Sequence, residues 1–227
     1  MWQILINRFK QGYRTIAYPK QVPGFPGRYR GRPVDVKGPV NLGELLFNEE
    51  AAAEGCFTYS KDHRMAVSNK EDLVAQGDEI RLAGALNDKM KRLFGRSLKL
   101  RQVCAGGCNG CEAEIQVTNI VVFDLSRFGI QFVASPRHAD GLVITGPVTK
   151  NMELALKKTY EAMPHPKIVI AVGSCAISGG PFRGSTEVRN GADSVVPVDL
   201  YIPGCPPHPL TILDGLLRML DRLEKKQ

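Results

Sequence analysis

The sequence predicts an α/β fold built on a mostly parallel sheet, and three observations carry this prediction. From about residue 98 onward, short apolar runs alternate with stretches of helical periodicity, as in βαβ units. The run Lys167–Val172 is continuously apolar, which is typical of a strand buried on both faces. A leucine stripe closes the chain, and 43% hydrophobic residues in 227 suffice for one large domain, or one domain with an appendage.

The first hundred residues have a different character. Residues 1–40 combine a short amphipathic helix with a Pro/Gly-rich, extended stretch, Tyr18–Pro33. Residues 41–96 are polar and partly helical, and Asp78–Leu93 is the best helix candidate because its apolar residues recur at helical spacing. Gly84 weakens that candidate. We therefore divide the chain into an N-terminal docking segment, 1–97, and a domain, 98–227.

The domain is predicted to alternate strands and helices. A helix is expected after Cys111, another over Thr149–Met163, and a last one from Leu210 to Leu223. The predicted strands are Leu98–Val103, Ile120–Phe123, Ile130–Ala134, Leu142–Thr145, Lys167–Val172 and Leu200–Ile202.

Charge and composition restrict the possible partners. The net charge is +7, and before residue 38 eight basic side chains face a single acid, Asp35. Such a strip suits an acidic subunit, anionic lipid or nucleic acid. No nucleic-acid-reading motif accompanies it, so we expect no nucleic acid, and subunit docking is favoured over a membrane-binding helix, although both can hold. No run of 18 apolar residues exists, and the start lacks the features of a signal peptide.

Four cysteines are placed to meet at one site. Cys108 and Cys111 form a CxxC pair, and Cys175 and Cys205 follow in separate loops. Each of these three segments comes directly after a predicted strand. Because ligands of open parallel sheets bind beyond the carboxyl ends of the strands, we expect the four thiols to converge there. This spacing indicates metal binding in a reducing compartment rather than disulfides.

The spacing favours an iron–sulfur cluster over zinc or four unliganded thiols. Structural zinc usually takes two CxxC knuckles, whereas this chain has one knuckle and two isolated cysteines. Ligands from three loops suit a cubane, and the glycines and prolines around them allow amide contacts and exclude water. Cys104, Cys108 and Cys111 also form the C-x3-C-x2-C motif of radical enzymes that use S-adenosylmethionine. We reject that interpretation because too few residues follow for a full barrel, and because Cys175 and Cys205 would have no role.

Three stretches carry a resemblance to a known family: Cys108–Ile115, Ala134–Asp140 and Val198–Pro207. Over residues 98–225 the chain resembles the small subunit of membrane-bound, energy-converting [NiFe] hydrogenases of the formate hydrogenlyase and hydrogenase-4 type. It also resembles the homologous terminal iron–sulfur subunit of respiratory complex I. The resemblance implies a flavodoxin-like sheet with helices on both faces. It also implies one [4Fe–4S] cluster on Cys108, Cys111, Cys175 and Cys205.

One detail separates the two relatives. The complex I subunit characteristically has two adjacent cysteines at the first site, whereas Cys108 and Cys111 are separated by two residues, as in the hydrogenases. His138 and Thr145–Asn151 also fit the hydrogenases. The resemblance therefore implies an electron-transfer subunit that relays electrons between a [NiFe] site in a large partner subunit and the clusters of a ferredoxin-like subunit. Quinone as the acceptor, as in complex I, and a zinc-binding assembly module are the alternatives.

The N-terminal segment carries a second resemblance. Tyr13–Pro19, Arg28–Pro33 and Ala66–Leu73 are similar to the ferredoxin-like subunit of the same complexes. Its cluster-binding motifs are absent and only Cys56 remains, so we interpret the segment as a degenerate copy retained for docking. Together the resemblances imply a peripheral membrane protein on the cytoplasmic face of a complex that also contains membrane subunits.

Several residues near the predicted cluster have two possible roles. Glu114 either carries a proton near the cluster or is an acid at a helix start. Arg137 and His138 either stabilise the reduced cluster or lie in an ordinary loop. The remaining expectations are a capping or interface role for His208 and small, buried positions for Cys104 and Cys56.

Overall fold

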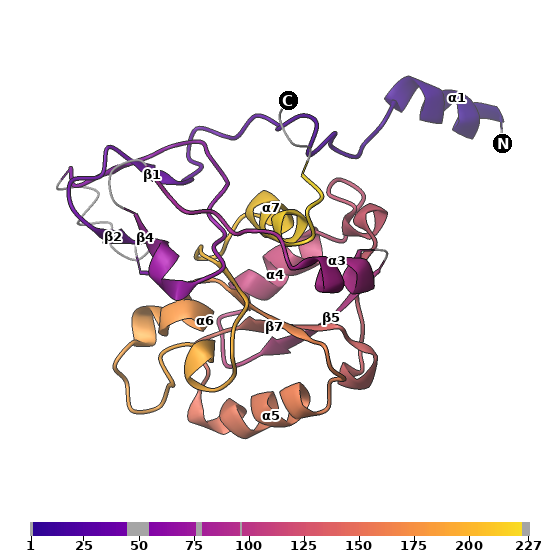
Figure 1. The fold of residues 1–227 in the computed structure, drawn as a ribbon. Helices are drawn as coiled ribbons and strands as arrows, with labels where there is room; N and C mark the ends of the chain where they lie inside the picture. The colour runs from indigo at the N-terminus through magenta and orange to yellow at the C-terminus, as the bar shows by residue number, and fades with distance from the viewer. Residues whose placement is uncertain (1, 45–54, 76–78, 96, 224–227) are drawn as a thin grey trace.

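The computed structural model describes residues 2–44, 55–75, 79–95 and 97–223 (Figure 1). Its centre is a five-stranded sheet in the order β6-β5-β7-β8-β9, with every neighbouring pair parallel. In chain order this is 2-1-3-4-5, the flavodoxin-like order, so the predicted fold class is confirmed. The strands are β5 (Leu98–Cys104), β6 (Ile130–Phe132), β7 (Gly141–Thr145), β8 (Ile168–Val172) and β9 (Leu200–Ile202).

Helices cover both faces of the sheet because the strand side chains alternate between two cores. On β7, Val143 belongs to one core, and Leu142 and Ile144 belong to the other. Helices α4 and α7 pack on the first face, with α3 beside them, while α5 and α6 pack on the second (Figure 1). The bounds are α3 (Asp88–Phe94), α4 (Gly110–Val117), α5 (Lys150–Glu161), α6 (Ser174–Ser178) and α7 (Pro209–Met219). Short 3₁₀-helical turns occur at Lys70–Leu73, Leu125–Phe128, Pro136–His138, Gly180–Phe182 and Ala192–Ser194.

The N-terminal segment begins with a short helix and then runs along the domain. Helix α1 (Trp2–Gln11) confirms the predicted amphipathic helix. Val67 makes an antiparallel bridge to Tyr201 of β9: each N–H donates to the other's carbonyl oxygen, at 3.0 and 2.9 Å. The bridge covers the edge of the sheet, which would otherwise leave backbone groups unpaired. The short antiparallel pairs are β1 (Pro33–Val34) with β3 (Thr58–Tyr59) and β2 (Val40–Asn41) with β4 (Val74–Ala75).

The proposed division at residue 97 stays a prediction. Residues on its N-terminal side, among them Ala66 and Leu73, are buried in the cores of the domain. None of the helices within the described ranges is both long and apolar enough to cross a membrane.

A buried polar network joins the N-terminal segment to α7. Asp214 is 1% exposed, and it accepts hydrogen bonds from the Tyr18 hydroxyl at 2.7 Å and from Arg218 at 2.6 Å. His63 Nε2 lies 3.2 Å from the same tyrosine oxygen, and burial lowers the pKa of His63. Because a buried carboxylate needs its partners, this network ties the two parts of the chain together.

Tyr18→Phe is expected to lower the free energy of unfolding by about 1–3 kcal/mol, because the buried carboxylate of Asp214 then loses one of its donors. Urea denaturation followed by circular dichroism measures this loss. Tyr13→Phe is the matched control, since the Tyr13 side chain is 95% exposed. Equal denaturation midpoints for the two variants would show that the network does not hold the segment in place.

The predicted strand Ile120–Phe123 is wrong. These residues form turns that follow α4, in which the Ile120 carbonyl accepts from Phe123 N–H at 3.1 Å and from Asp124 N–H at 2.8 Å. Ile120 and Val121 are 48% and 58% exposed, so their apolar character does not reflect burial in a sheet. The other five predicted strands are present, with shifts of a few residues at their ends.

The predicted helix Asp78–Leu93 is largely wrong. Asp78 lies outside the described residues, and the chain is not helical from Ile80 to Asn87. Tertiary contacts hold that stretch instead, since Ala83 N–H donates to Ala66 and Leu86 N–H donates to Met219 of α7. The helix begins only after Asn87, whose side chain caps it by accepting from Met90 N–H at 3.0 Å.

Candidate metal centre

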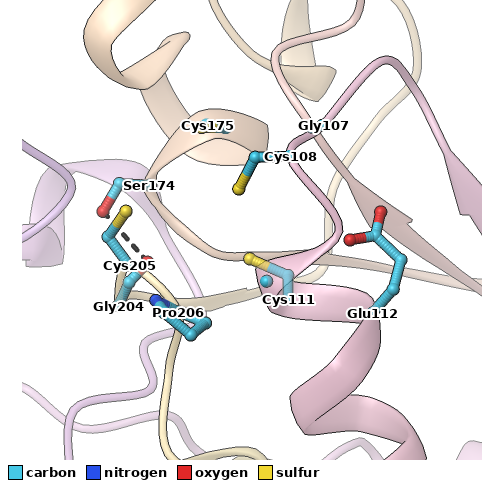
Figure 2. A pocket seen from close by; sticks show the side chains of 11 residues that line it. Gly107, Cys108, Cys111, Glu112, Ser174, Cys175, Gly204, Cys205 and Pro206 are labelled. Atoms are coloured by element: carbon cyan, nitrogen blue, oxygen red, sulfur yellow. Dashed lines mark hydrogen bonds between the residues drawn. The ribbon is translucent and has the colours of Figure 1, made fainter.

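The four predicted cysteines line one cavity at the carboxyl edge of the sheet. The cavity has about 310 Å³ of empty space, part of it open to solvent. Figure 2 shows the sulfurs of Cys108, Cys111 and Cys205 pointing toward this space. Cys175 and the backbone of three glycine-containing loops complete its wall. Within the described ranges, no three His, Cys, Asp or Glu side chains are grouped as around a single metal ion.

The first cysteine pair is positioned by the turn from β5 into α4. Asn109 has a left-handed conformation with φ of 72°, which lets the chain reverse between the two thiols. Cys111 consequently lies in the first turn of α4, where free backbone N–H groups favour negative charge. The neighbouring Glu112 accepts a hydrogen bond from Thr145 Oγ1 at 2.5 Å. This bond ties α4 to the end of β7 and directs the carboxylate along the cavity wall (Figure 2).

The loops that carry Cys175 and Cys205 are bonded to each other. Ser174 donates to the carbonyl oxygen of Gly204 twice, from its backbone N–H at 2.8 Å and from its hydroxyl at 3.2 Å. Gly173 N–H donates to Ile202 at 2.9 Å, which continues the pairing of β8 with β9. The two thiols are thus fixed relative to each other by backbone bonds.

Two glycines allow the backbone to approach the sulfurs. Gly173 has φ of +88°, and a Cβ at this position would collide with Sγ of Cys111. A Cβ on Gly180, whose φ is +55°, would lie 2.8 Å from Sγ of Cys175. Both positions therefore need glycine for conformation and for space.

Partial burial and mutual crowding affect the protonation of three of the thiols. Burial, followed by the charges of Glu112 and the other cysteines, raises the pKa of the Cys111 thiol well above its usual range. Burial also raises the pKa of Cys175 to about 11 and the pKa of Cys205. As free thiols these groups hold their protons at neutral pH. A bound cation reverses this preference because it stabilises the thiolates.

The remaining two cysteines lie apart from the cavity. Cys104, the last residue of β5, is exposed, so the expectation of a buried position is wrong. Cys56 is partly buried against the second core. Neither of these two thiols lines the cavity that the other four share.

Arg137 and His138 do not lie near the cysteines. Both side chains are exposed, in the 3₁₀ turn Pro136–His138 that immediately precedes β7. They consequently lie at the amino-terminal edge of the sheet, whereas the cysteines lie at its carboxyl edge. The suggestion that they stabilise a cluster is therefore wrong.

Two other residues lie beside the cysteines. His208 is the N-cap of α7, where its Nδ1 accepts from Leu210 N–H at 3.1 Å, so the predicted capping role is confirmed. Glu114 is half-buried on α4, and burial raises the pKa of its carboxyl group. Both line a second cavity that also contacts Cys205. A proton-carrying role for Glu114 stays a prediction.

Glu112, Thr145 and Ser174 are positioning residues that the sequence pattern does not predict. In the sequence, Glu112 is marked only as the acid directly after the CxxC pair. Thr145 and Ser174 are marked only by their position, since each follows the apolar part of a buried strand. Their hydrogen bonds join segments that are distant in sequence, which a linear pattern does not reveal.

Comparison with known proteins finds one family over the cysteine-containing region. The model of the family described as NADH ubiquinone oxidoreductase, 20 Kd subunit, matches residues 108–219, which include all four cysteines. Formate hydrogenlyase subunit 7 of Escherichia coli is 49% identical over 131 residues, 58% of this chain and 51% of the relative. The chain thus matches about half the length of that relative.

A second relative and a solved structure cover more of their own length. A subunit of the NADH-quinone oxidoreductase of Desulfovibrio desulfuricans is 48% identical over 148 residues, which make up 64% of this chain and 79% of the relative. A chain of the membrane-bound sulfane sulfur reductase, an archaeal respiratory membrane complex, superimposes with a TM-score of 0.52. Its sequence is 34% identical to this chain, and the match covers 61% of this chain and 77% of the reductase chain. The identity and coverage of these matches show that the chain belongs to the family of the NADH ubiquinone oxidoreductase 20 Kd subunit, whose relatives here are subunits of oxidoreductase complexes.

Proposed function

We propose that the chain is an electron-transfer subunit that holds one [4Fe–4S] cluster on Cys108, Cys111, Cys175 and Cys205. The observation that carries the proposal is the convergence of these four thiols, from three loops, on one cavity. When bound, the cluster supplies one-electron chemistry. The protein then needs no nucleophile or general acid of its own at this site.

The donor set fits a cluster better than a single zinc ion. The thiols line one cavity, and they come from three separate loops rather than from two knuckles. Gly173 and Gly180 bring backbone close to two of the sulfurs, and nearby backbone amides are one means by which a protein tunes an iron–sulfur cluster. Pro206 lies against the same cavity and limits the access of water.

The residues of this chain position the thiols and set the local charge. The bonds between Ser174 and Gly204 fix the two isolated cysteine loops, and the Glu112–Thr145 bond fixes α4. The Glu112 carboxylate adds negative charge beside the thiolates, which disfavours addition of an electron. Cys108 and Cys205 are exposed. Their side of the cavity is therefore where a partner subunit would cover the cluster.

The partners we propose follow from the named relatives. A large [NiFe]-hydrogenase-like subunit would exchange electrons with the cluster, and a ferredoxin-like subunit would carry them further. The relative from a formate hydrogenlyase supports this assignment. The sulfane sulfur reductase is described as a membrane complex, which supports membrane subunits in the same assembly. We place the chain on the cytoplasmic face as a peripheral component.

Quinone is the second candidate for the electron acceptor. The specific observation in its favour is the 48% identity to the NADH-quinone oxidoreductase subunit, almost equal to the 49% identity to the formate hydrogenlyase subunit. The two-residue gap between Cys108 and Cys111 supports the hydrogenase type. Assays of the isolated complex separate the two, because hydrogen turnover without quinone reduction supports the first and the reverse result supports the second.

The cluster proposal predicts the metal content of the purified protein. After anaerobic purification, alone or in its complex, the chain is expected to contain about four irons and to show broad visible absorption. The reduced protein should give one cubane-type electron paramagnetic resonance signal. Stoichiometric zinc without iron would instead support the assembly module, and protein without metal would contradict both assignments.

A further inference from the structure

Helix α1 carries an apolar stripe that the domain does not cover. Trp2, Leu5, Ile6 and Phe9 recur at the spacing of one helix face. The side chains of Trp2 and Phe9 are 76% and 85% exposed, and no residue of α1 is buried. Figure 1 shows the helix extending away from the body of the molecule. The stripe therefore has no partner among the described residues.

Basic residues border this stripe, and acids are absent around it. At 3.6 residues per turn, Arg8 and Lys10 lie on opposite sides of the apolar face. The first acidic residue of the sequence is Asp35, so the helix and the segment after it are uniformly basic. A helix facing water usually mixes both signs of charge, and its first turn favours acids. The pattern of α1 is instead that of helices lying in the plane of an anionic membrane surface.

The helix is joined to the domain by a short connection that limits its movement. Gly12, with φ of +61°, ends the helix, and its carbonyl accepts from Arg8 at 2.6 Å. Three residues further on, Thr15 Oγ1 donates to Val121 at 2.7 Å. That turn exposes Val121 and Ile120, which are apolar as well. The domain therefore presents additional apolar side chains where the chain leaves α1.

We propose that α1 binds the surface of an anionic bilayer and holds this subunit against the membrane. The aromatic residues support lipid over a protein groove, because Trp2 and Tyr13 lie at the two ends of the segment, and such rings favour the membrane interface. The partner of α1 is thus the lipid surface. This contact with lipid adds to the proposed membrane association and does not depend on the cluster.

Trp2 makes the test direct, because it is the only tryptophan of the chain. The full chain is titrated with vesicles of phosphatidylcholine containing phosphatidylglycerol, or with phosphatidylcholine alone. With the anionic vesicles we expect a blue shift of the tryptophan emission and protection from iodide quenching. Neutral vesicles should bind clearly more weakly, and salt should weaken the anionic interaction.

Two variants identify the apolar face. Phe9→Gln is expected to weaken vesicle binding about tenfold. This is the lower end of the loss in affinity expected when one aromatic side chain is no longer buried in the membrane interface. Ile4→Gln is the matched control, since Ile4 is 71% exposed but lies outside the stripe. Neither change removes a buried side chain, so both proteins should fold. Visible absorption of the same samples reports cluster content separately.

Several results would overturn the inference. An unchanged Trp2 emission with anionic vesicles would do so, as would equal binding to neutral vesicles or equal losses in the two variants. Protection of Trp2 only in the assembled complex, with no response to vesicles, would assign α1 to a partner subunit instead. Loss of visible absorption with normal vesicle binding would contradict the cluster while supporting the lipid contact.

Discussion

Replacing Cys205 with serine is expected to remove most of the iron–sulfur cluster. The Cys205 thiol lines the cavity from the loop after β9, and the other three thiols are already placed on its remaining sides. A serine hydroxyl is a harder ligand than a thiolate and loses its proton less readily than a thiol does, so the cluster loses one of its four ligands. Iron analysis and visible absorption should both fall by more than about half in anaerobically purified protein.

Cys104→Ser is the matched control for this prediction. Both cysteines are exposed, and each lies at or just beyond the carboxyl end of a strand, but only Cys205 lines the cavity. The control should retain the iron content and the absorption of the unmodified chain. If Cys104→Ser removed the cluster and Cys205→Ser spared it, the ligand assignment would be wrong, and the C-x3-C-x2-C interpretation would regain support.

The convergence of the cysteines could be predicted because it depends on topology more than on side-chain detail. Apolar runs such as Lys167–Val172 and Leu200–Ile202 identify buried parallel strands. Parallel strands bring their carboxyl ends to one edge, so cysteines that follow them must lie near each other. The structure places Cys108, Cys111 and Cys175 at that edge together with Cys205, as this topology requires.

The errors in the sequence prediction have different physical causes. Ile120–Phe123 has the composition of a strand, but hydrogen bonds close it into turns after α4. The stretch before α3 has helical spacing, yet Ala83 and Leu86 donate to distant carbonyls instead. Arg137 and His138 belong to a stretch that resembles the family, but a resemblance in sequence does not tell at which edge of the sheet a turn lies.

Gly173→Ala is expected to reduce cluster binding as strongly as the loss of a ligand. A Cβ at this position would collide with Sγ of Cys111 and would lie 3.4 Å from the carbonyl oxygen of Gly204, so the Cys111 sulfur has to shift. With φ of +88° and ψ of 154°, Gly173 has a backbone conformation that is essentially restricted to glycine, so an alanine there costs a further ~1–3 kcal/mol. Iron content and visible absorption should fall by more than about half, because Cys111 is displaced from the cavity wall.

Gly184→Ala separates the collision from the backbone strain. Gly184 has a similar φ of +80°, but nothing lies within 4 Å of the position of its Cβ. Both variants should therefore lose stability because alanine disfavours a positive φ, and urea denaturation of the metal-free proteins measures each loss. Only Gly173→Ala should also lose iron. Equal iron contents in the two variants would contradict this prediction. They would mean that shifting the Cys111 sulfur does not affect the cluster, so that Cys111 does not hold the cluster in the position described.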